Sequence, residues 1–153
     1  MLYGYIIVCV HVGGKVMPVV EKLICKEKDG TLSFGNYLLQ EKKKLENFKY
    51  EGDLYKIKTY YEITKLEKNG MFVYESVPGT SVNHMKVTEK GMDFSVEGKE
   101  DAQITLELEP EKEYKVTIDE NESSVVKTNM SGKLNLSVEL NEGQAVSLKV
   151  ELV

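Results

Sequence analysis

The chain has 153 residues, of which 41% are hydrophobic, and carries a formal net charge of −5 at pH 7. This length and apolar content suffice for the core of one domain, or of two small ones, and argue against a disordered chain. All 20 basic residues are lysine. The chain therefore lacks the forked guanidinium group with which arginine recognises carboxylates and phosphates.

The charge is divided unevenly along the chain. Residues 1–76 contain 12 lysines and 10 acidic residues, and residues 77–153 contain 8 lysines and 15 acidic residues, so the net charges are +2 and −7. The acidic half is a poor partner for nucleic acid, and we expect no nucleic-acid binding.

Residues 1–16 support two hypotheses. The stretch from Gly13 to Met17, GGKVM, is what translation of a purine-rich GGAGG element just before an ATG codon would give, which makes residues 1–16 a translated leader. Alternatively, residues 5–12, YIIVCVHV, form an extra N-terminal strand, because they are rich in β-branched residues. No signal peptide is recognised, since the basic region and the cleavage site are missing.

Cys9 and Cys25 are too few for a disulfide framework. We therefore expect reduced thiols and a cytoplasmic location, with an extracellular location as the alternative. No stretch reaches the roughly 18 apolar residues that span a bilayer, so we expect no membrane span.

Residues 17–84 predict an N-terminal region rich in β-hairpins. Residues 19–28 and 31–39 flank Asp29-Gly30, a pair typical of tight hairpin turns. Residues 40–47 are too short and too charged for a stable isolated helix, and we expect a surface crossing or one helical turn there.

Two further hairpins follow. Residues 54–63 and 71–77 flank Asn69-Gly70, which suits a type I′ turn, and residues 81–88 pair with residues 92–98. In the first of these strands the odd-numbered residues are expected to face the core: Tyr55, Ile57, Thr59, Tyr61 and Ile63.

Residues 85–153 predict an antiparallel β-sandwich. Four segments alternate apolar and polar residues with a period of two: residues 104–108, 114–118, 134–140 and 146–152. Turn-forming residues separate them, so they should join as antiparallel neighbours. Five side chains are expected to be buried: Leu106, Tyr114, Val116, Leu136 and Leu148. The whole chain is thus predicted to be all-β, as one compact body or two apposed sandwiches.

Residues 108–116, LEPEKEYKV, resemble the L-x-P-x-x-x-Y-x-V signature of fibronectin type III domains. In that family and other immunoglobulin-like sandwiches, the tyrosine, here Tyr114, forms a hydrogen bond to upstream backbone at a sheet-to-sheet corner. The early core tryptophan that is common in the family is absent. The resemblance implies a binding or spacer module without catalytic residues.

The whole chain is also similar to short β proteins of clostridial-type anaerobes, some of which carry an endosialidase label. Sialidase-like sites resemble one another in holding the substrate carboxylate with an arginine cluster, and this chain contains no arginine. We therefore expect no sialidase activity.

No residue spacing typical of a metal site, a nucleotide-binding loop or a nucleophilic enzyme occurs. Cys25 and His84 are expected to be a small buried apolar residue and a loop histidine, and not a catalytic pair. Acidic pairs at residues 100–101 and 119–120 lie in predicted turns, where solvated side chains are the simplest interpretation. We expect no enzyme activity, no metal and no cofactor.

Tyrosines are concentrated in the first half of the chain. Their apolar ring and polar tip suit protein or sugar surfaces. Tyr60 falls on the strand face expected to meet solvent, and Tyr50 and Tyr74 are further candidates for a binding surface.

The sequence favours a non-catalytic β-sandwich protein that binds a protein partner or self-associates through its strand edges. The alternative is a carbohydrate-binding or carbohydrate-processing accessory protein, as the tyrosines and acidic turns indicate.

Overall fold

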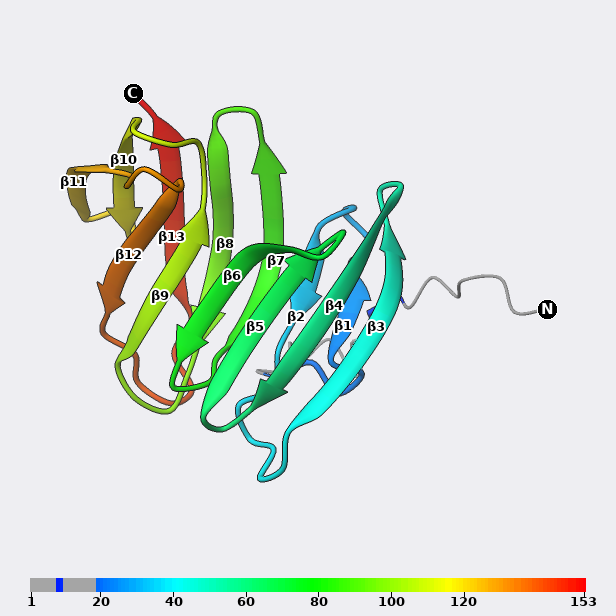
Figure 1. The fold of residues 1–153 in the computed structure, drawn as a ribbon. Helices are drawn as coiled ribbons and strands as arrows, with labels where there is room; N and C mark the ends of the chain where they lie inside the picture. Colours follow the sequence, from blue (N-terminus) through cyan, green and yellow to red (C-terminus); the bar gives the residue numbers. More distant parts are fainter. Residues whose placement is uncertain (1–7, 10–18) are drawn as a thin grey trace.

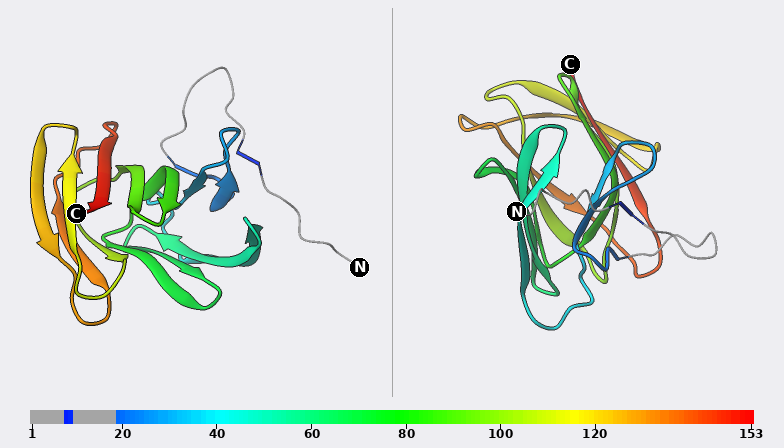
Figure 2. Two further views of the ribbon diagram at one scale, coloured as in Figure 1. Left: turned by 90° about the horizontal axis from the view of Figure 1, so that it is seen from above. Right: turned by 90° about the vertical axis from the view of Figure 1, so that its right-hand side faces the viewer.

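The structure, a computed structural model, describes residues 8–9 and 19–153. Within these residues the chain forms thirteen strands and no helix, and strands contain more than half of the residues. The strands build two antiparallel sheets packed face to face, with sheet B in front of sheet A in Figure 1 and the two layers seen from other sides in Figure 2. The predicted all-β sandwich is confirmed. In the described part of the chain, no helix is long and apolar enough to cross a membrane.

Sheet A has seven strands in the order β1-β2-β7-β8-β13-β10-β11, and sheet B has six in the order β12-β9-β6-β5-β4-β3. The strands of sheet A are β1 (Ile24–Lys26), β2 (Leu32–Phe34), β7 (Ser81–Thr88), β8 (Gly91–Glu97), β13 (Val146–Leu152), β10 (Glu113–Ile118) and β11 (Glu122–Lys127). Those of sheet B are β12 (Lys133–Val138), β9 (Ala102–Glu107), β6 (Met71–Val77), β5 (Ile63–Lys68), β4 (Asp53–Tyr60) and β3 (Lys43–Tyr50). The boundary expected between residues 84 and 85 falls within β7, and each sheet draws strands from both sides of it.

The core between the sheets contains side chains from Ile24 to Val150. The four alternating segments of the second half form β9, β10, β12 and β13, and their predicted core residues are buried: Leu106, Tyr114, Val116, Leu136 and Leu148. Alternation predicts these strands well because each has one face that packs only against the opposite sheet.

Strand β11 is absent from the sequence prediction. Its residues, ESSVVK, do not alternate, and β11 is an edge strand that pairs only with β10. An edge strand of this kind buries little, and Val125 is 59% exposed. Hydrophobic periodicity therefore gives no signal for β11.

The expected surface crossing or helical turn at residues 40–47 is wrong. Residues from Lys43 onward form β3, the edge strand of sheet B, which pairs with β4. The register shifts between Leu45 and Phe48, and Phe48 is the only buried residue of the strand. The bulge and the exposed edge together remove the period-two pattern from the sequence.

The predicted alternation of residues 54–63 holds within β4 and stops where the strand ends. Tyr55, Ile57 and Thr59 are buried, but Tyr61 lies in the following turn and is 46% exposed. Ile63 begins β5 and is half-buried. The expectation that Tyr61 faces the core is therefore wrong.

A tyrosine hydroxyl forms a hydrogen bond with the segment that connects β9 and β10, two strands in different sheets. The Tyr114 hydroxyl accepts a hydrogen bond of 3.2 Å from the backbone N–H of Glu109. This is the type of contact that the fibronectin type III resemblance implies for Tyr114. Membership of that family stays a prediction.

Buried hydroxyl groups join the inner face of sheet B to the residue before β7. Thr80 Oγ1 lies 2.7 Å from both the Tyr74 hydroxyl and Ser76 Oγ. The Thr64 hydroxyl donates to the Thr80 carbonyl over 2.7 Å and lies 2.8 Å from Thr59 Oγ1. All five residues have 0% exposure, so each hydroxyl depends on the others for its hydrogen bonds.

Thr80→Val tests this network, because it removes the hydroxyl group to which the buried Tyr74 and Ser76 hydroxyls are bonded. We expect the free energy of unfolding to fall by about 1–3 kcal/mol in urea denaturation. The matched control is Thr105→Val, whose hydrogen bond to Asn135 lies on the exposed face of sheet B; its effect should stay within about 0.5 kcal/mol. Equal effects of the two substitutions would contradict a special role for Thr80.

Candidate functional site

The outer face of sheet B carries a cluster that we name the lysine face: Lys42, Lys44, Lys58 and Lys65. Cross-strand pairing places Lys44 opposite Lys58, and Lys58 opposite Lys65, so three like charges lie in one row across β3, β4 and β5. Alternate residues of β4 and β5 are buried in the core, which directs these lysines away from it. This surface is the one that sheet B turns toward the viewer in Figure 1.

An acidic group partly compensates the lysine face, since Glu75 lies directly opposite Lys65 in the register of β5 and β6. Desolvation, followed by the charges of the other three lysines, lowers the pKa of the Lys58 ammonium group, and Glu75 opposes this effect. No lysine of the face forms an ion pair with a described residue. Lysines around it do, as in the 3.4 Å pair of Lys56 with Glu46. The ammonium groups of the lysine face are therefore available to an anionic ligand.

The three tyrosines proposed as surface residues lie in different places. Tyr60 borders the lysine face, since it follows Lys58 by two residues on β4, and its hydroxyl donates to Glu62 over 2.7 Å. Tyr50 is half-buried, and its hydroxyl donates to the Gly30 carbonyl over 2.6 Å.

The expected surface position of Tyr74 is wrong, because its side chain has 0% exposure and belongs to the buried hydroxyl network. Polar Ser76 shares the face of β6 that points inward, so the sequence alternation did not reveal which face was the core.

A hollow of about 250 Å³ lies near the turn after β4, and its lining includes Tyr37, Leu38, Gln40, Tyr61, Lys99 and Glu100. Burial is the main cause that raises the pKa of the Tyr37 phenol, and Glu97 and Glu142 add to it. The lining combines aromatic rings with amide and charged groups, which can orient a small ligand.

The acidic turns are used within the fold. Asp101 accepts a 3.0 Å hydrogen bond from the backbone N–H of Leu140, and Asp119 accepts one of 2.9 Å from that of Ser147. Their carboxylates therefore hold connections between strands.

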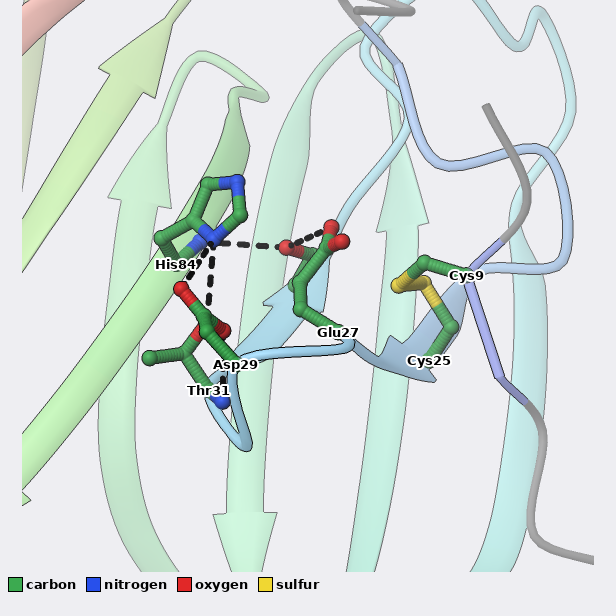
Figure 3. The surroundings of a disulfide bond; sticks show 7 residues. Cys9, Cys25, Glu27, Asp29, Thr31 and His84 are labelled. Atoms are coloured by element: carbon green, nitrogen blue, oxygen red, sulfur yellow. Dashed lines mark hydrogen bonds and ion pairs between the residues drawn. A yellow bond between two sulfur atoms is a disulfide. The ribbon is translucent and has the colours of Figure 1, made fainter. Parts of the chain in front are cut away.

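Cys9 and Cys25 form a disulfide bond at the edge of sheet A, with a Cα–Cα distance of 5.1 Å (Figure 3). The backbone N–H of Cys9 donates to the Lys26 carbonyl over 2.8 Å, and Val8 forms a parallel bridge with Lys26. The expectation of two reduced thiols is wrong, because the two sulfur atoms are bonded to each other. The spacing of the two cysteines in the sequence gives no sign of this contact. The cytoplasmic location, which was inferred from reduced thiols, stays a prediction.

Glu27 lies beside the disulfide and is only 4% exposed. The Ser33 hydroxyl donates to Glu27 Oε1 over 2.8 Å. The pairing of β1 with β2 positions Ser33 near Glu27, since Cys25 and Ser33 are directly opposite each other in the register of these strands.

An exposed cluster at the first hairpin turn contains Asp29, Thr31 and His84. Hydrogen bonds from Thr31 are the main cause that lowers the pKa of Asp29, with a smaller effect of His84. His84 lies in β7 and not in a loop, and its Nδ1 is 3.2 Å from Asp29 Oδ2. Since Cys25 is in a disulfide, it supplies no thiol to His84 in this structure.

Comparison with known proteins gives no match: no family model fits the chain, and no curated protein or solved structure is similar to it. Function must therefore be inferred from the arrangement of side chains. The sequence showed a short basic run from Lys42 to Lys44 and lysines that alternate along residues 56–58, but only the strand register reveals that Lys44, Lys58 and Lys65 form one row.

A chain that begins at Met17 distinguishes the leader hypothesis from a structural role of residues 1–16, most of which lie outside the described residues. This deletion removes Cys9 and therefore the disulfide, which for a loop of this size contributes about 3 kcal/mol. We expect the melting temperature to fall by roughly 10 °C under oxidising conditions. A melting temperature within a few degrees of that of the full chain would support the leader instead.

Proposed function

We propose that the protein is a non-catalytic β-sandwich binding module whose lysine face binds a protein partner with an acidic surface. The observation that carries this proposal is the row of Lys44, Lys58 and Lys65 on three adjacent strands. Like charges directly opposite each other destabilise a sheet. Features that break such local rules are typical of functional surfaces, where a ligand supplies the missing interaction.

A second copy of the chain is one candidate for such a partner. Residues 77–153 carry a net charge of −7, whereas the lysine face is positive. Charge complementarity between copies would favour self-association that weakens as salt rises.

Binding is tested with fluorescently labelled poly-L-glutamate, a peptide anion, in an anisotropy titration at low and at high salt. We expect binding that weakens with salt, and a loss of affinity on the order of 10-fold when Lys44, Lys58 and Lys65 are together replaced by Gln, since each partly screened charge pair contributes up to about 1 kcal/mol.

The matched control replaces Lys112, Lys115 and Lys127 by Gln, which changes the net charge equally but lies outside sheet B. Equal losses in the two triple variants would show that the net charge of the chain, and not the lysine face, determines binding. Tighter binding to a DNA duplex of similar charge would contradict a protein partner.

Stability separates a functional surface from an ordinary strand face. Lys58→Gln removes repulsion in the centre of the row, so we expect the free energy of unfolding to rise by roughly 0.2–1 kcal/mol while poly-L-glutamate binding weakens. A variant that is less stable than the natural chain would contradict the idea that these lysines are retained for binding at the expense of stability.

Carbohydrate binding is the second candidate function, and the hollow lined by Tyr37 and Tyr61 supports it. A glycan array should then show hits that Tyr61→Ala or Tyr60→Ala removes while the triple lysine variant keeps them. An array without hits would exclude this candidate for the glycans tested.

A further inference from the structure

Cys9, Cys25 and Glu27 bring three metal-binding atoms together beside β1 (Figure 3). The two sulfur atoms and a carboxylate oxygen all lie within 4.8 Å of one another. The three residues are 7%, 5% and 4% exposed, so the cluster is shielded from bulk water. Cys25 and Glu27 are two residues apart, and extended backbone directs such side chains to the same side.

Cys9 has backbone contacts to β1 in addition to the S–S bond. Its N–H donates to the Lys26 carbonyl over 2.8 Å, next to the bridge between Val8 and Lys26. We therefore expect the two thiols to stay close to each other after the disulfide is reduced.

The carboxylate of Glu27 is oriented by the Ser33 hydroxyl, which donates to Oε1 over 2.8 Å. Hydrogen bonds of this kind commonly fix a carboxylate that binds a metal. Ser33 is itself 0% exposed, so its hydroxyl is a fixed part of the cluster.

We propose that Cys9, Cys25 and Glu27 bind a Zn²⁺ ion when the disulfide is reduced. Cysteine thiolates and carboxylate oxygens are both zinc ligands, whereas Mg²⁺ and Ca²⁺ prefer oxygen ligands alone. Zinc bonds of about 2.0–2.3 Å need ligand atoms closer than about 4 Å to one another, which side-chain rotation achieves once the sulfurs separate. A water molecule or a further ligand completes the tetrahedral coordination.

The disulfide and the zinc site exclude each other because they use the same two sulfur atoms. A dithiol reductant transfers two electrons to the S–S bond and becomes a disulfide, while Cys9 and Cys25 become thiols. Zinc binding then releases one proton from each thiol, and the two sulfurs remain bound as thiolates. In the oxidised form of the cluster, a covalent bond links the two sulfur atoms. In the reduced form, the metal ion links them.

The test uses the full chain, reduced with a phosphine, freed of metal with a chelator and titrated with Co²⁺ and then Zn²⁺. We expect one Co²⁺ per chain, a thiolate-to-cobalt charge-transfer band, its loss on addition of Zn²⁺, and a rise in the melting temperature of the reduced protein with Zn²⁺. The oxidised protein should show neither the band nor the rise. Absence of binding to the reduced chain, or equal binding to the oxidised chain, overturns the proposal.

Variants assign the ligands. Cys9→Ser and Cys25→Ser should each weaken the cobalt band, and Glu27→Gln should lower zinc affinity by on the order of 10-fold or more. The matched controls are Glu21→Gln, an exposed acid near β1, and His84→Ala, which removes the exposed imidazole near Asp29; both should bind zinc as the natural chain does. Urea unfolding of each reduced variant shows that it is folded. Unchanged affinity of folded Glu27→Gln, or a loss in His84→Ala equal to that in Cys25→Ser, overturns this assignment.

Discussion

The packing of sheet B against sheet A constrains most of the molecule, because it leaves each strand of sheet B with one buried face. Ile57 and Leu66 must point inward, where they have 0% exposure. The alternate residues of β4 and β5 must then point outward, and these include Lys56, Lys58 and Lys65. The lysine face is thus a direct consequence of core packing, and the strand register decides which charges meet. A shift of one residue would bury the charges and expose the core.

Polar groups, as well as apolar contacts, determine how the two sheets are connected. Thr80 lies between β6 of sheet B and β7 of sheet A, and its side chain and backbone bind hydroxyl groups of Tyr74, Ser76 and Thr64. A buried hydroxyl group without a hydrogen bond costs free energy. Few other routes of the chain between β6 and β7 would give all of these hydroxyl groups a partner. The network therefore fixes the point at which the chain passes from one sheet to the other.

Sequence patterns predicted the parts of the fold in which local chemistry and burial agree. Strands such as β9 and β13 alternate strictly, and Asn69-Gly70 forms a turn with positive φ angles as its composition requires. The edge strands β3 and β11 were misread or missed, because they bury too few side chains to impose a period. Tyr74 was misplaced because the inward face of β6 also contains Ser76, which pairs with Thr80 instead of meeting solvent.

The candidate sites were less predictable than the fold, because the lysine face and the cysteine cluster both depend on contacts between segments that are far apart in the sequence. Lys44 and Lys65 meet through β4, and Cys9 reaches Cys25 through a single parallel bridge at Lys26. Ile24 points into the core, so Cys25 beside it faces the opposite side of sheet A, whereas the lysine face lies on the outer side of sheet B. The core separates the two sites. Changes in the oxidation state of the cysteines therefore have no direct contact through which to alter the lysines, and each site can be studied with the other as an internal control.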